Sequence, residues 1–304
     1  MLRYLIIGIG VQGNKRKRYI KKSNYITVDT NNNADYQTVE EVPLNKYDVA
    51  LICVPDNEKL SIIEYCIRNK KHILVEKPFP IVKKQKLINL FKTAKEKKIV
   101  LYVAYNHRFE PHFKKTKKII DSKILGKIYS CRLFYGNGTA LLVKNSPWRD
   151  KSLGVVTDLG SHLLDLCNYW FEHEKIKISK SLLFNFENKS YDHAKILFMK
   201  NKTSFEFELS LCMWRNHFTC DILAEKGSLH ISSLCKWDTA KFILRKRIFP
   251  SGKPKEKILK IKSEDPTWRE EFNYFKYLIK NRKYLNYNRD LMINDTINQI
   301  EKNI

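Results

Sequence analysis

The pair of residues with the clearest chemical potential in this sequence is Asp158 and His162, within the stretch Gly154–Asp165. If this stretch is helical, residues four apart lie on the same face, so the carboxylate comes within reach of the imidazole. A histidine with a carboxylate partner can accept and return a proton near neutral pH. The alternative is structural, with Asp158 capping a helix and His162 a core or boundary histidine. Apolar residues mark the opposite, buried side of the predicted helix: Leu159, Leu163, Leu164 and Leu166.

A glycine pattern near the start of the sequence predicts a dinucleotide site. The apolar run Tyr4–Ile7 leads directly into the hexapeptide Gly8-Ile9-Gly10-Val11-Gln12-Gly13. A strand followed by Gly-x-Gly-x-x-Gly is the context that dinucleotide-binding folds require. Gly8 would make the tight turn, Gly10 would let a pyrophosphate approach the backbone, and Gly13 would allow close helix packing. Val11 and Gln12 belong to the same predicted cofactor loop.

An acidic residue follows the next apolar run and bears on the choice of cofactor. Tyr25–Val28 ends in Asp29, about twenty residues after the first glycine, where a carboxylate can contact ribose hydroxyls. Because this carboxylate would repel a ribose phosphate, Asp29 predicts NAD. The alternative is a turn-forming aspartate ahead of Asn31–Asn33. The basic run Lys15–Arg18, expected in the first turn of a helix, opposes the helix dipole unless it is solvated or near an anion such as a pyrophosphate, and it leaves NADP open.

Strands and helices then alternate as in repeated βαβ units. Such units predict a doubly wound parallel sheet whose ligands lie at the carboxyl ends of the strands. Two of these ends are Glu76-Lys77-Pro78, where the proline bond can adopt the cis form, and Tyr105-Asn106-His107-Arg108-Phe109. Lys77 is therefore expected where the reactive ring of the cofactor should reach. The predicted elements are strands at 48–54, 73–75 and 99–104, a helix at 58–68 that ends with Asn69 in the left-handed conformation, and a helix at 82–98.

With these motifs the chain resembles the glucose-fructose oxidoreductase, inositol dehydrogenase and MocA family of nicotinamide-dependent oxidoreductases. The resemblance covers essentially the whole chain and implies a Rossmann domain, followed by an α+β domain whose open, mostly antiparallel sheet often forms the subunit interface. Two departures are Lys59, where a histidine is common, and Ser152-Leu153-Gly154, in place of a run of glycines. We expect both to affect the substrate more than the proton-transfer groups. The motifs that carry the resemblance are the glycine hexapeptide, Val54-Pro55, Glu76-Lys77-Pro78, the stretch 105–109, and Asp158 with His162.

The resemblance also implies roles for individual residues. Lys77, Asp158 and His162 fall on catalytic positions. Arg149 is implied to reach the cofactor or substrate. Trp148 is implied to contact the substrate, and the alternative is that it is only a boundary aromatic residue. No metal site is expected. The cofactor contacts implied outside the glycine loop and Asp29 are Val54, Pro55, Glu76, Lys77, Asn106 and Arg149. The substrate contacts implied are Lys77, Tyr105, Arg108, Trp148, Asp158 and His162.

The second half of the sequence predicts a sheet with flanking helices. We expect an N-terminal Rossmann domain over residues 1–118 and an α+β domain over 119–304. Gly126 would end a linking helix, Gly227 would mark a hairpin, and alternate residues from Phe205 to Leu211 would cover helices or a partner subunit. The predicted elements are a helix at 111–125, strands at 127–135, 182–186, 194–199, 204–212, 219–224 and 229–232, and helices at 268–279 and 290–301.

Composition narrows the class of protein. A length of 304 residues suits two domains. The net charge of +25 comes from scattered lysines without a nucleic-acid-binding motif, so we expect a solvated surface that favours anionic ligands and no nucleic-acid partner. Seven cysteines without a Cys-x-x-Cys motif indicate reduced thiols in a cytoplasmic protein. No apolar span approaches membrane length, so no membrane association is expected.

These inferences predict an NAD(P)-dependent oxidoreductase that moves a hydride between nicotinamide and a secondary alcohol or ketone of a sugar, nucleotide sugar or inositol, in the biosynthesis of surface-polysaccharide sugars. His162 would be the general base, Asp158 would orient it, and Lys77 would stabilise charge on the oxygen. A homodimer or homotetramer through the C-terminal sheet is expected. The alternatives are a hydrolase or lyase that oxidises its sugar transiently with bound NAD, a non-catalytic nicotinamide-binding protein, and a basic nucleic-acid binder.

Overall fold

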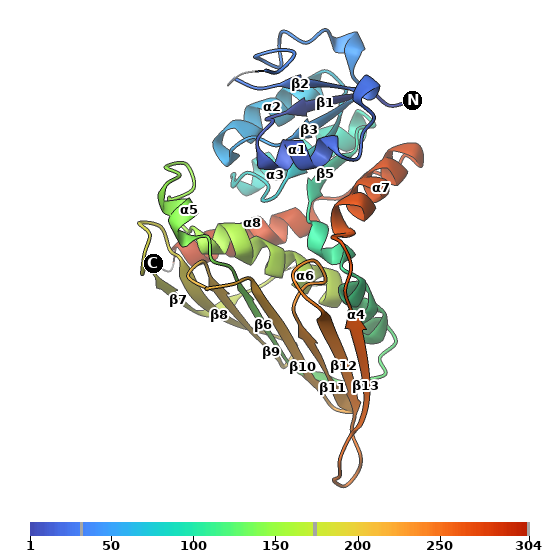
Figure 1. Ribbon diagram of the computed structural model, residues 1–304, viewed down its shortest axis with the longest axis vertical. Helices are drawn as coiled ribbons and strands as arrows, with labels where there is room; N and C mark the ends of the chain where they lie inside the picture. The colour runs from blue at the N-terminus through green and yellow to red at the C-terminus, as the bar shows by residue number, and fades with distance from the viewer. Residues whose placement is uncertain (31–32, 173–174, 303–304) are drawn as a thin grey trace. The chain divides into compact units, whose positions relative to one another are not determined.

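Two β-sheets organise the chain, one in each of two packing units (Figure 1). The computed structural model describes residues 1–30, 33–172 and 175–302. Unit 1 consists of Met1–Asn106 together with Trp268–Asn294, and unit 2 consists of His107–Thr267 together with the residues from 295 on. A helix from late in the sequence thus packs with the N-terminal sheet. The functional division after residue 118 stays a prediction.

The sheet of unit 1 is parallel, as the alternating pattern predicted. Its five strands lie in the order β2-β1-β3-β4-β5, and each neighbouring pair is parallel. The continuous apolar runs are buried because helices cover both faces of such a sheet. The strands are β1 (Tyr4–Ile7), β2 (Tyr25–Val28), β3 (Val49–Ile52), β4 (His72–Glu76) and β5 (Leu101–Ala104).

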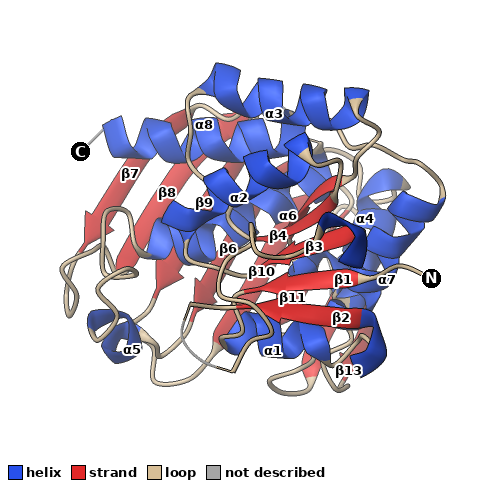
Figure 2. Cartoon of the chain, turned by 90° about the horizontal axis from the view of Figure 1, so that it is seen from above, coloured by secondary structure: helices blue, strands red, loops and turns tan. Residues whose placement is uncertain are grey.

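Helices α2 and α3 pack against each other, and α2 also packs along β3 and β4 (Figure 2). Helix α7 brings Phe272, Phe275 and Leu278 into the core that Tyr4 and Ile6 form with the other strands. The predicted end of α2 is wrong in one detail: the left-handed residue is Lys70, with φ 54°, whereas Asn69 has φ −89°. The helices are α1 (Val11–Lys17), α2 (Asp56–Arg68), α3 (Lys84–Glu96) and α7 (Thr267–Lys280).

The sheet of unit 2 has eight strands in the order β13-β12-β11-β10-β6-β9-β8-β7. Strands β6 and β9 pair in parallel and the other neighbours pair antiparallel, which confirms the open, mostly antiparallel sheet. The sequence analysis missed β12 and β13. The strands are β6 (Ile128–Gly136), β7 (Ile178–Phe184), β8 (His193–Lys200), β9 (Thr203–Ser210), β10 (His217–Ala224), β11 (Gly227–Ser232), β12 (Ala240–Lys246) and β13 (Lys255–Ile261).

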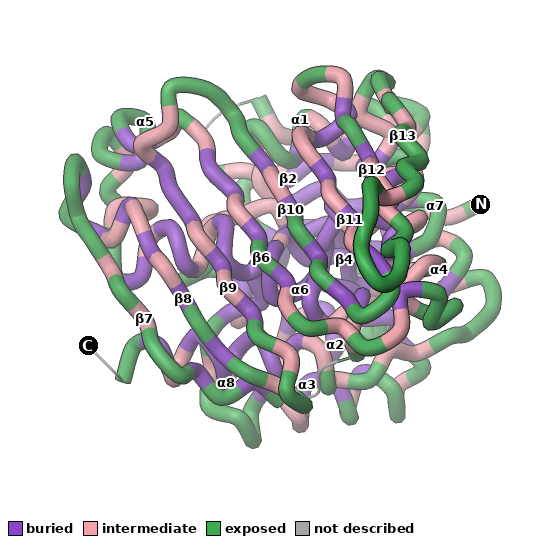
Figure 3. The backbone as a smooth tube through the Cα atoms, turned by 90° about the horizontal axis from the view of Figure 1, so that it is seen from below, coloured by how far each residue is buried: buried purple, intermediate pink, exposed green. Residues whose placement is uncertain are grey.

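The two faces of this sheet differ in burial, and buried and exposed segments alternate along its strands (Figure 3). Phe205, Phe207, Leu209 and Leu211 are buried, and Leu209 lies against the backbone at Gly160, so the alternating face covers helical structure. The other face, which we call the outer face, is solvent-exposed. The helices of this half are α4 (Pro111–Asp121), α5 (Ala140–Lys144), which the sequence analysis missed, α6 (Ser161–Phe171) and α8 (Asn288–Lys302), of which Asp295 onward belongs to unit 2.

All seven cysteines are free thiols, as expected. Among the helices in the described ranges 1–30, 33–172 and 175–302, we find none with the length and apolar character needed to cross a membrane.

His112 in α4 predicts a pH dependence of stability. Its side chain is buried, and this burial lowers the pKa of the imidazole to about 4 from its ordinary 6.5. Between these values the unfolded chain binds the proton more readily, so the free energy of unfolding falls as the pH falls. Lowering the pH from about 7.5 to about 5 should therefore remove about 2 kcal/mol of stability through this residue. Urea unfolding at both pH values measures the loss.

The control compares variants, because burial also raises the pKa of the neighbouring Glu110, which acts in the opposite direction. In His112→Gln, Glu110 remains and the acid-induced loss should shrink by about 2 kcal/mol. In His217→Gln, which changes an exposed histidine, the loss should equal that of the wild type. Equal losses in the wild type and His112→Gln would contradict the prediction.

Candidate active site

The strands of unit 1 end level with one another, and this aligns several of the predicted site residues. Ile7 pairs with both Val28 and Ile52, and Ile52 pairs with Val75. Because parallel strands share a direction, the segments that follow them emerge at one edge, which we call the carboxyl edge. The strand order reverses between β1 and β3, where ligands of such sheets bind. The residues at this edge are Gly8–Gly13, Asp29, Val54, Pro55, Glu76 and Lys77, with Tyr105 and Asn106 following β5.

The three glycines of the loop after β1 have different surroundings. Gly8 has φ 84°, and a Cβ there would lie 2.7 Å from the carbonyl oxygen of Cys53. A Cβ on Gly13 would lie 2.0 Å from the carbonyl oxygen of Gly8. At Gly10, by contrast, no atom lies within 4 Å of the added Cβ, and the neighbouring Val11 and Gln12 are exposed. Gly8 and Gly13 therefore serve the packing of the loop, and the open space at Gly10 fits the approach of a dinucleotide pyrophosphate.

Asp29 contacts this loop directly. Its Oδ2 accepts a hydrogen bond from the backbone N–H of Ile9 at 2.7 Å, which fixes the carboxylate beside the glycines. A carboxylate has about four lone-pair sites, so one amide does not exhaust its capacity to accept hydrogen bonds from ribose hydroxyls. Of the asparagines in the alternative turn, Asn31 and Asn32 lie outside the described residues, and Asn33 has φ 44°.

The basic residues after the glycines were expected in the first turn of a helix, but the structure places them at its other end. Lys15, Arg16 and Lys17 lie in the last turn of α1, where cations favour the helix dipole. Arg16 is buried, and its guanidinium binds Glu76 and Glu271, each at 2.7 Å. Burial alone would lower the pKa of Arg16, but the two carboxylates outweigh it and raise the pKa above its ordinary value. The anion that Arg16 needs is thus supplied by the protein.

Lys59 holds the turn that carries Lys77. Its ammonium donates to the carbonyl oxygens of Glu76, Lys77 and Pro78 at 2.8, 3.2 and 3.0 Å. The Lys77–Pro78 bond is cis, as the sequence suggested. Lys59 was expected to affect the substrate more than the proton-transfer groups. It contacts the backbone of Lys77, a predicted catalytic residue, and its effect on the substrate stays a prediction. The second departure is Ser152-Leu153-Gly154. A glycine is required at position 154, because a Cβ there would lie 2.3 Å from the carbonyl oxygen of Tyr191.

In unit 2 the predicted pair lies at the start of α6. The segment is helical, but Asp158 belongs to a π-helical turn (Val156–Gly160), and His162 lies in the first turn of the α-helix that follows. The four leucines are buried, as predicted, but the opposite side is not exposed, because Ser161 to Cys167 are all buried, with His162 only 6% exposed. Arg149, 30% exposed, pairs with the Asp158 carboxylate at 3.2 Å. Asp158 therefore has a cationic partner from outside its helix.

Aromatic rings surround His162. His107 stacks on it with ring centroids 3.9 Å apart and an interplanar angle of 17°. The Tyr135 ring lies 6.1 Å from His162 and 5.4 Å from His107. Burial, with smaller contributions from Asp158 and other carboxylates, raises the pKa of the Tyr135 hydroxyl well above its ordinary value, so the phenol remains neutral at pH 7. Among these groups, an imidazole is the one suited to exchange a proton near neutrality. The sequence analysis quoted His107 only as part of a motif.

The remaining predicted contacts have defined surroundings. Arg108 binds Asp165 through two hydrogen bonds of 3.0 and 2.5 Å, which ties the segment after β5 to α6. Tyr105 is buried beneath the Arg289 guanidinium, 5.1 Å from the ring centroid. Asn106 is buried, and Trp148 is 54% exposed. Whether these residues and Arg149 contact substrate or cofactor stays a prediction.

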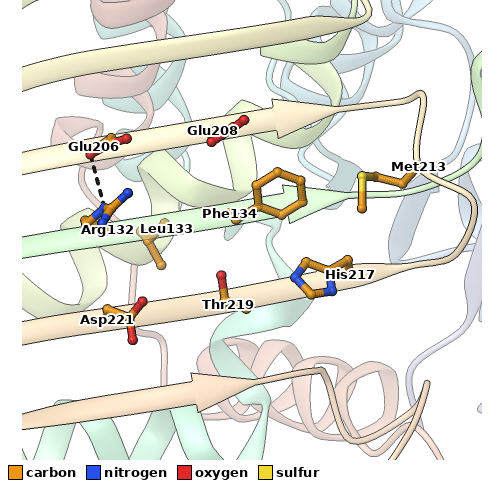
Figure 4. Close-up of a pocket in the computed structure, with 9 residues that line it drawn as sticks. All are labelled: Arg132, Leu133, Phe134, Glu206, Glu208, Met213, His217, Thr219 and Asp221. Carbon is orange, nitrogen blue, oxygen red and sulfur yellow. Dashed lines mark ion pairs between the residues drawn. The ribbon is translucent and has the colours of Figure 1, made fainter.

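A polar pocket on the outer face of the unit 2 sheet lies outside the predicted site. Figure 4 shows it on β6, β9 and β10, with Arg132 paired to Glu206 at 3.1 Å. Glu208, Thr219 and His217 also line it. The sequence analysis did not identify this pocket, because residues of an alternating strand give no signal of their own for a concave surface.

A five-stranded parallel sheet with a dinucleotide glycine loop, joined to a unit with an open mixed sheet, defines a class of two-part nucleotide-dependent enzymes. Residues 2–105 match the domain described as "Oxidoreductase family, NAD-binding Rossmann fold", and residues 113–230 match the "GFO/IDH/MocA C-terminal domain". The chain belongs to the GFO/IDH/MocA family of oxidoreductases.

The individual relatives share low sequence identity with this chain, and the sequence matches cover only part of it. Glucose-6-phosphate 3-dehydrogenase of Bacillus subtilis is 30% identical over 42% of this chain and 37% of its own length. Inositol 2-dehydrogenase of Rhizobium meliloti is 26% identical over 43% of this chain and 39% of its own. The matches thus span less than two thirds of these curated relatives. Levoglucosan dehydrogenase in complex with NADH has the same fold, with a TM-score of 0.82, 16% identity, and 99% and 96% of the two chains covered.

The open space at Gly10 leads to a prediction about cofactor binding. In Gly10→Ala the methyl group meets no atom of the protein, so the melting temperature should stay near that of the wild type. The same methyl group would stand where a pyrophosphate approaches, and we expect the Kd for NADH to rise roughly tenfold or more, which is about 1.4 kcal/mol or more of binding free energy. Fluorescence titration with NADH measures it.

Gly13→Ala is the contrasting variant, since its methyl group would collide with the backbone of Gly8 and should lower the melting temperature. Wild-type affinity for NADH in a folded Gly10→Ala variant would reject the assignment of this loop to the cofactor.

Proposed function

We propose that the protein is an NAD(P)-dependent oxidoreductase that acts on a CH–OH group of a sugar, nucleotide sugar or inositol. The observation that carries the proposal is the carboxyl edge of unit 1, where the level strand ends bring the Glu76-Lys77-Pro78 turn out at the same edge as the glycine loop and Asp29. Family membership and the dehydrogenases among the relatives support the same reaction.

In the mechanism that we propose, the protein accepts and returns one proton and provides one stabilising positive charge. Bound nicotinamide supplies the chemistry of accepting a hydride from carbon or returning it. His162 accepts the hydroxyl proton through its imidazole, and Asp158 orients and stabilises the resulting imidazolium. Lys77 places its ammonium beside the oxygen on which negative charge develops. The stacking of His107 on His162 fits the role of a proton acceptor. Protonation of both imidazoles is disfavoured, because it would bring two positive charges within about 4 Å of each other.

The identity of cofactor and substrate is proposed from charge. Asp29, held beside the glycine loop, favours NAD over NADP because it would repel a ribose phosphate. The net charge of +25 favours an anionic substrate such as a nucleotide sugar, which suits a role in making surface-polysaccharide sugars. All the proposed nucleotide contacts except Arg149 lie in unit 1, which contains the residues 2–105 that match the NAD-binding domain.

We also propose a homodimer or homotetramer that forms through the outer face of the unit 2 sheet. Large apolar side chains are exposed on these strands, and the face also carries ion pairs such as Arg132 with Glu206. A polar surface that includes exposed apolar side chains is typical of an interaction face. The exposed apolar residues are Leu182, Phe184, Leu197, Met199, Leu223 and Ile258.

A substrate panel tests the reaction class. Polyols, free sugars and nucleotide sugars are offered with NAD and with NADP, while the absorbance of reduced nicotinamide is followed. We expect reduced nicotinamide to accumulate with at least one substrate, at a higher kcat/KM for NAD than for NADP. Product formation without net reduction of the cofactor would favour a hydrolase or lyase that uses NAD transiently. Cofactor binding without turnover of any compound would favour a non-catalytic nicotinamide-binding protein.

Variants test the assigned residues. Lys77→Met and His162→Gln should each lower kcat by roughly 100-fold or more, because each removes a group that acts in the transition state. The Kd for NADH should change little, since neither side chain is proposed to contribute most of the dinucleotide binding. His72→Gln changes a histidine at the amino end of β4, opposite the carboxyl edge, and serves as the histidine control that should keep wild-type kcat. Wild-type turnover in either active-site variant would reject its assignment.

A further inference from the structure

The turn Glu76-Lys77-Pro78 directs three consecutive carbonyl oxygens toward one buried ammonium. The Nζ of Lys59 lies 2.8 Å from the oxygen of Glu76, 3.2 Å from that of Lys77 and 3.0 Å from that of Pro78. The Oδ1 of Asp56 lies 2.6 Å from the same nitrogen. An ammonium has three N–H donors and no acceptor, so its full donor capacity is directed at this turn and at one carboxylate.

We propose that Lys59 is a positioning residue, whose ammonium fixes the conformation of the turn and thereby the place of the Lys77 side chain. The proposal rests on the function proposed above, in which Lys77 acts on the substrate oxygen. Lys59 itself is 2% exposed and contacts neither substrate nor cofactor in this assignment. It acts through the backbone of the residue that does.

The ammonium of Lys59 is buried, so it needs polar partners within the protein. Burial lowers the pKa of Lys59, although Asp56 and Glu76 act in the opposite direction. A buried ammonium costs several kcal/mol in solvation unless it is paired and hydrogen-bonded. The three carbonyl groups and Asp56 provide those partners, and each carbonyl would otherwise lose a partner in a buried place. The ammonium and the turn therefore stabilise each other.

A second contact holds the same turn from its side chain. The Oε1 of Glu76 accepts from Arg16 at 2.8 Å, and Arg16 in turn binds Glu271 of α7. Glu76 is thus fixed at its carboxylate by Arg16 and at its carbonyl by Lys59. Lys77 follows directly in sequence, so its backbone has little freedom. The positive charge of Lys59 also repels the Lys77 ammonium, which disfavours a conformation in which Lys77 folds back on its own turn.

The test is a Lys59→Met variant, which keeps most of the volume and removes the ammonium. We expect kcat to fall roughly 10- to 100-fold, because a displacement of about 1 Å in a catalytic group can cost about that much. The Kd for NADH should stay within about twofold of the wild type. Lys71→Met is the matched control, since Lys71 in the same unit donates to the carbonyl oxygens of Leu44 and Tyr47 at 2.6 and 2.8 Å, outside the catalytic turn. It should lower stability and leave kcat unchanged.

Chemical rescue separates positioning from general damage. In Lys59→Ala the missing atoms correspond to propylammonium, and adding this cation should restore part of the lost kcat, whereas it should leave the kcat of Lys71→Met at the wild-type value. If Lys59→Met does not fold, Lys59→His takes its place. Because an imidazole keeps one N–H donor, its kcat should lie between that of the wild type and that of Lys59→Ala without propylammonium.

The outcomes separate this inference from the proposed function. If Lys77→Met loses turnover while Lys59→Met keeps wild-type kcat, the positioning role is overturned and the proposed function stands. The positioning role is also overturned if Lys59→Ala loses kcat without any response to propylammonium. If Lys77→Met keeps wild-type turnover, the proposed function itself fails.

Discussion

A parallel strand that ends at a buried edge leaves carbonyl groups without ladder partners, and in unit 1 one ammonium satisfies three of them. Lys59 binds the consecutive carbonyl oxygens of Glu76, the last residue of β4, and of Lys77 and Pro78, which follow it. The backbone polar groups of a buried turn must find partners, because an unpaired one costs free energy comparable to a lost hydrogen bond. The proposed site depends on this contact, since the turn delivers Lys77 to the carboxyl edge.

The buried cations of unit 1 are tolerated because the chain supplies their counterions. Arg16 has Glu76 and Glu271, and Lys59 has Asp56 together with the three carbonyl groups. Removing one partner of a pair that is buried on both sides, such as Arg16 with Glu271, is strongly destabilising, by about 3–5 kcal/mol, because the other charge remains buried without compensation. The lysines of the solvated surface carry no such constraint. A net charge of +25 is therefore compatible with buried cations in unit 1, because Arg16 and Lys59 each have a carboxylate partner.

Elements defined by local pattern could be predicted from the sequence, and contacts between distant segments could not. The glycine loop after β1 and the buried runs of β3 and β4 follow from glycine spacing and apolar continuity, which are local properties. Strand β13 was missed because its sequence, KEKILKI, lacks a continuous apolar run and is mostly exposed at the sheet edge, where lysines discourage further pairing. The pairing of Arg16 with Glu271 spans 255 positions, and no pattern within either segment indicates it.

The role of Lys59 shows why a departure from a family pattern can mislead. We expected this departure to affect the substrate more than the proton-transfer groups, but α2 packs along β4, which brings position 59 next to the turn that follows this strand. A neutral imidazole donates through one ring nitrogen, whereas an ammonium has three N–H donors. The three N–H groups of lysine can therefore be shared among the carbonyl groups of the turn and Asp56, whereas a neutral histidine could donate to one oxygen only. A lysine in place of the histidine that the resemblance implies then changes how the turn that carries Lys77 is supported, and it leaves the proposed proton-transfer residues Asp158 and His162 unchanged.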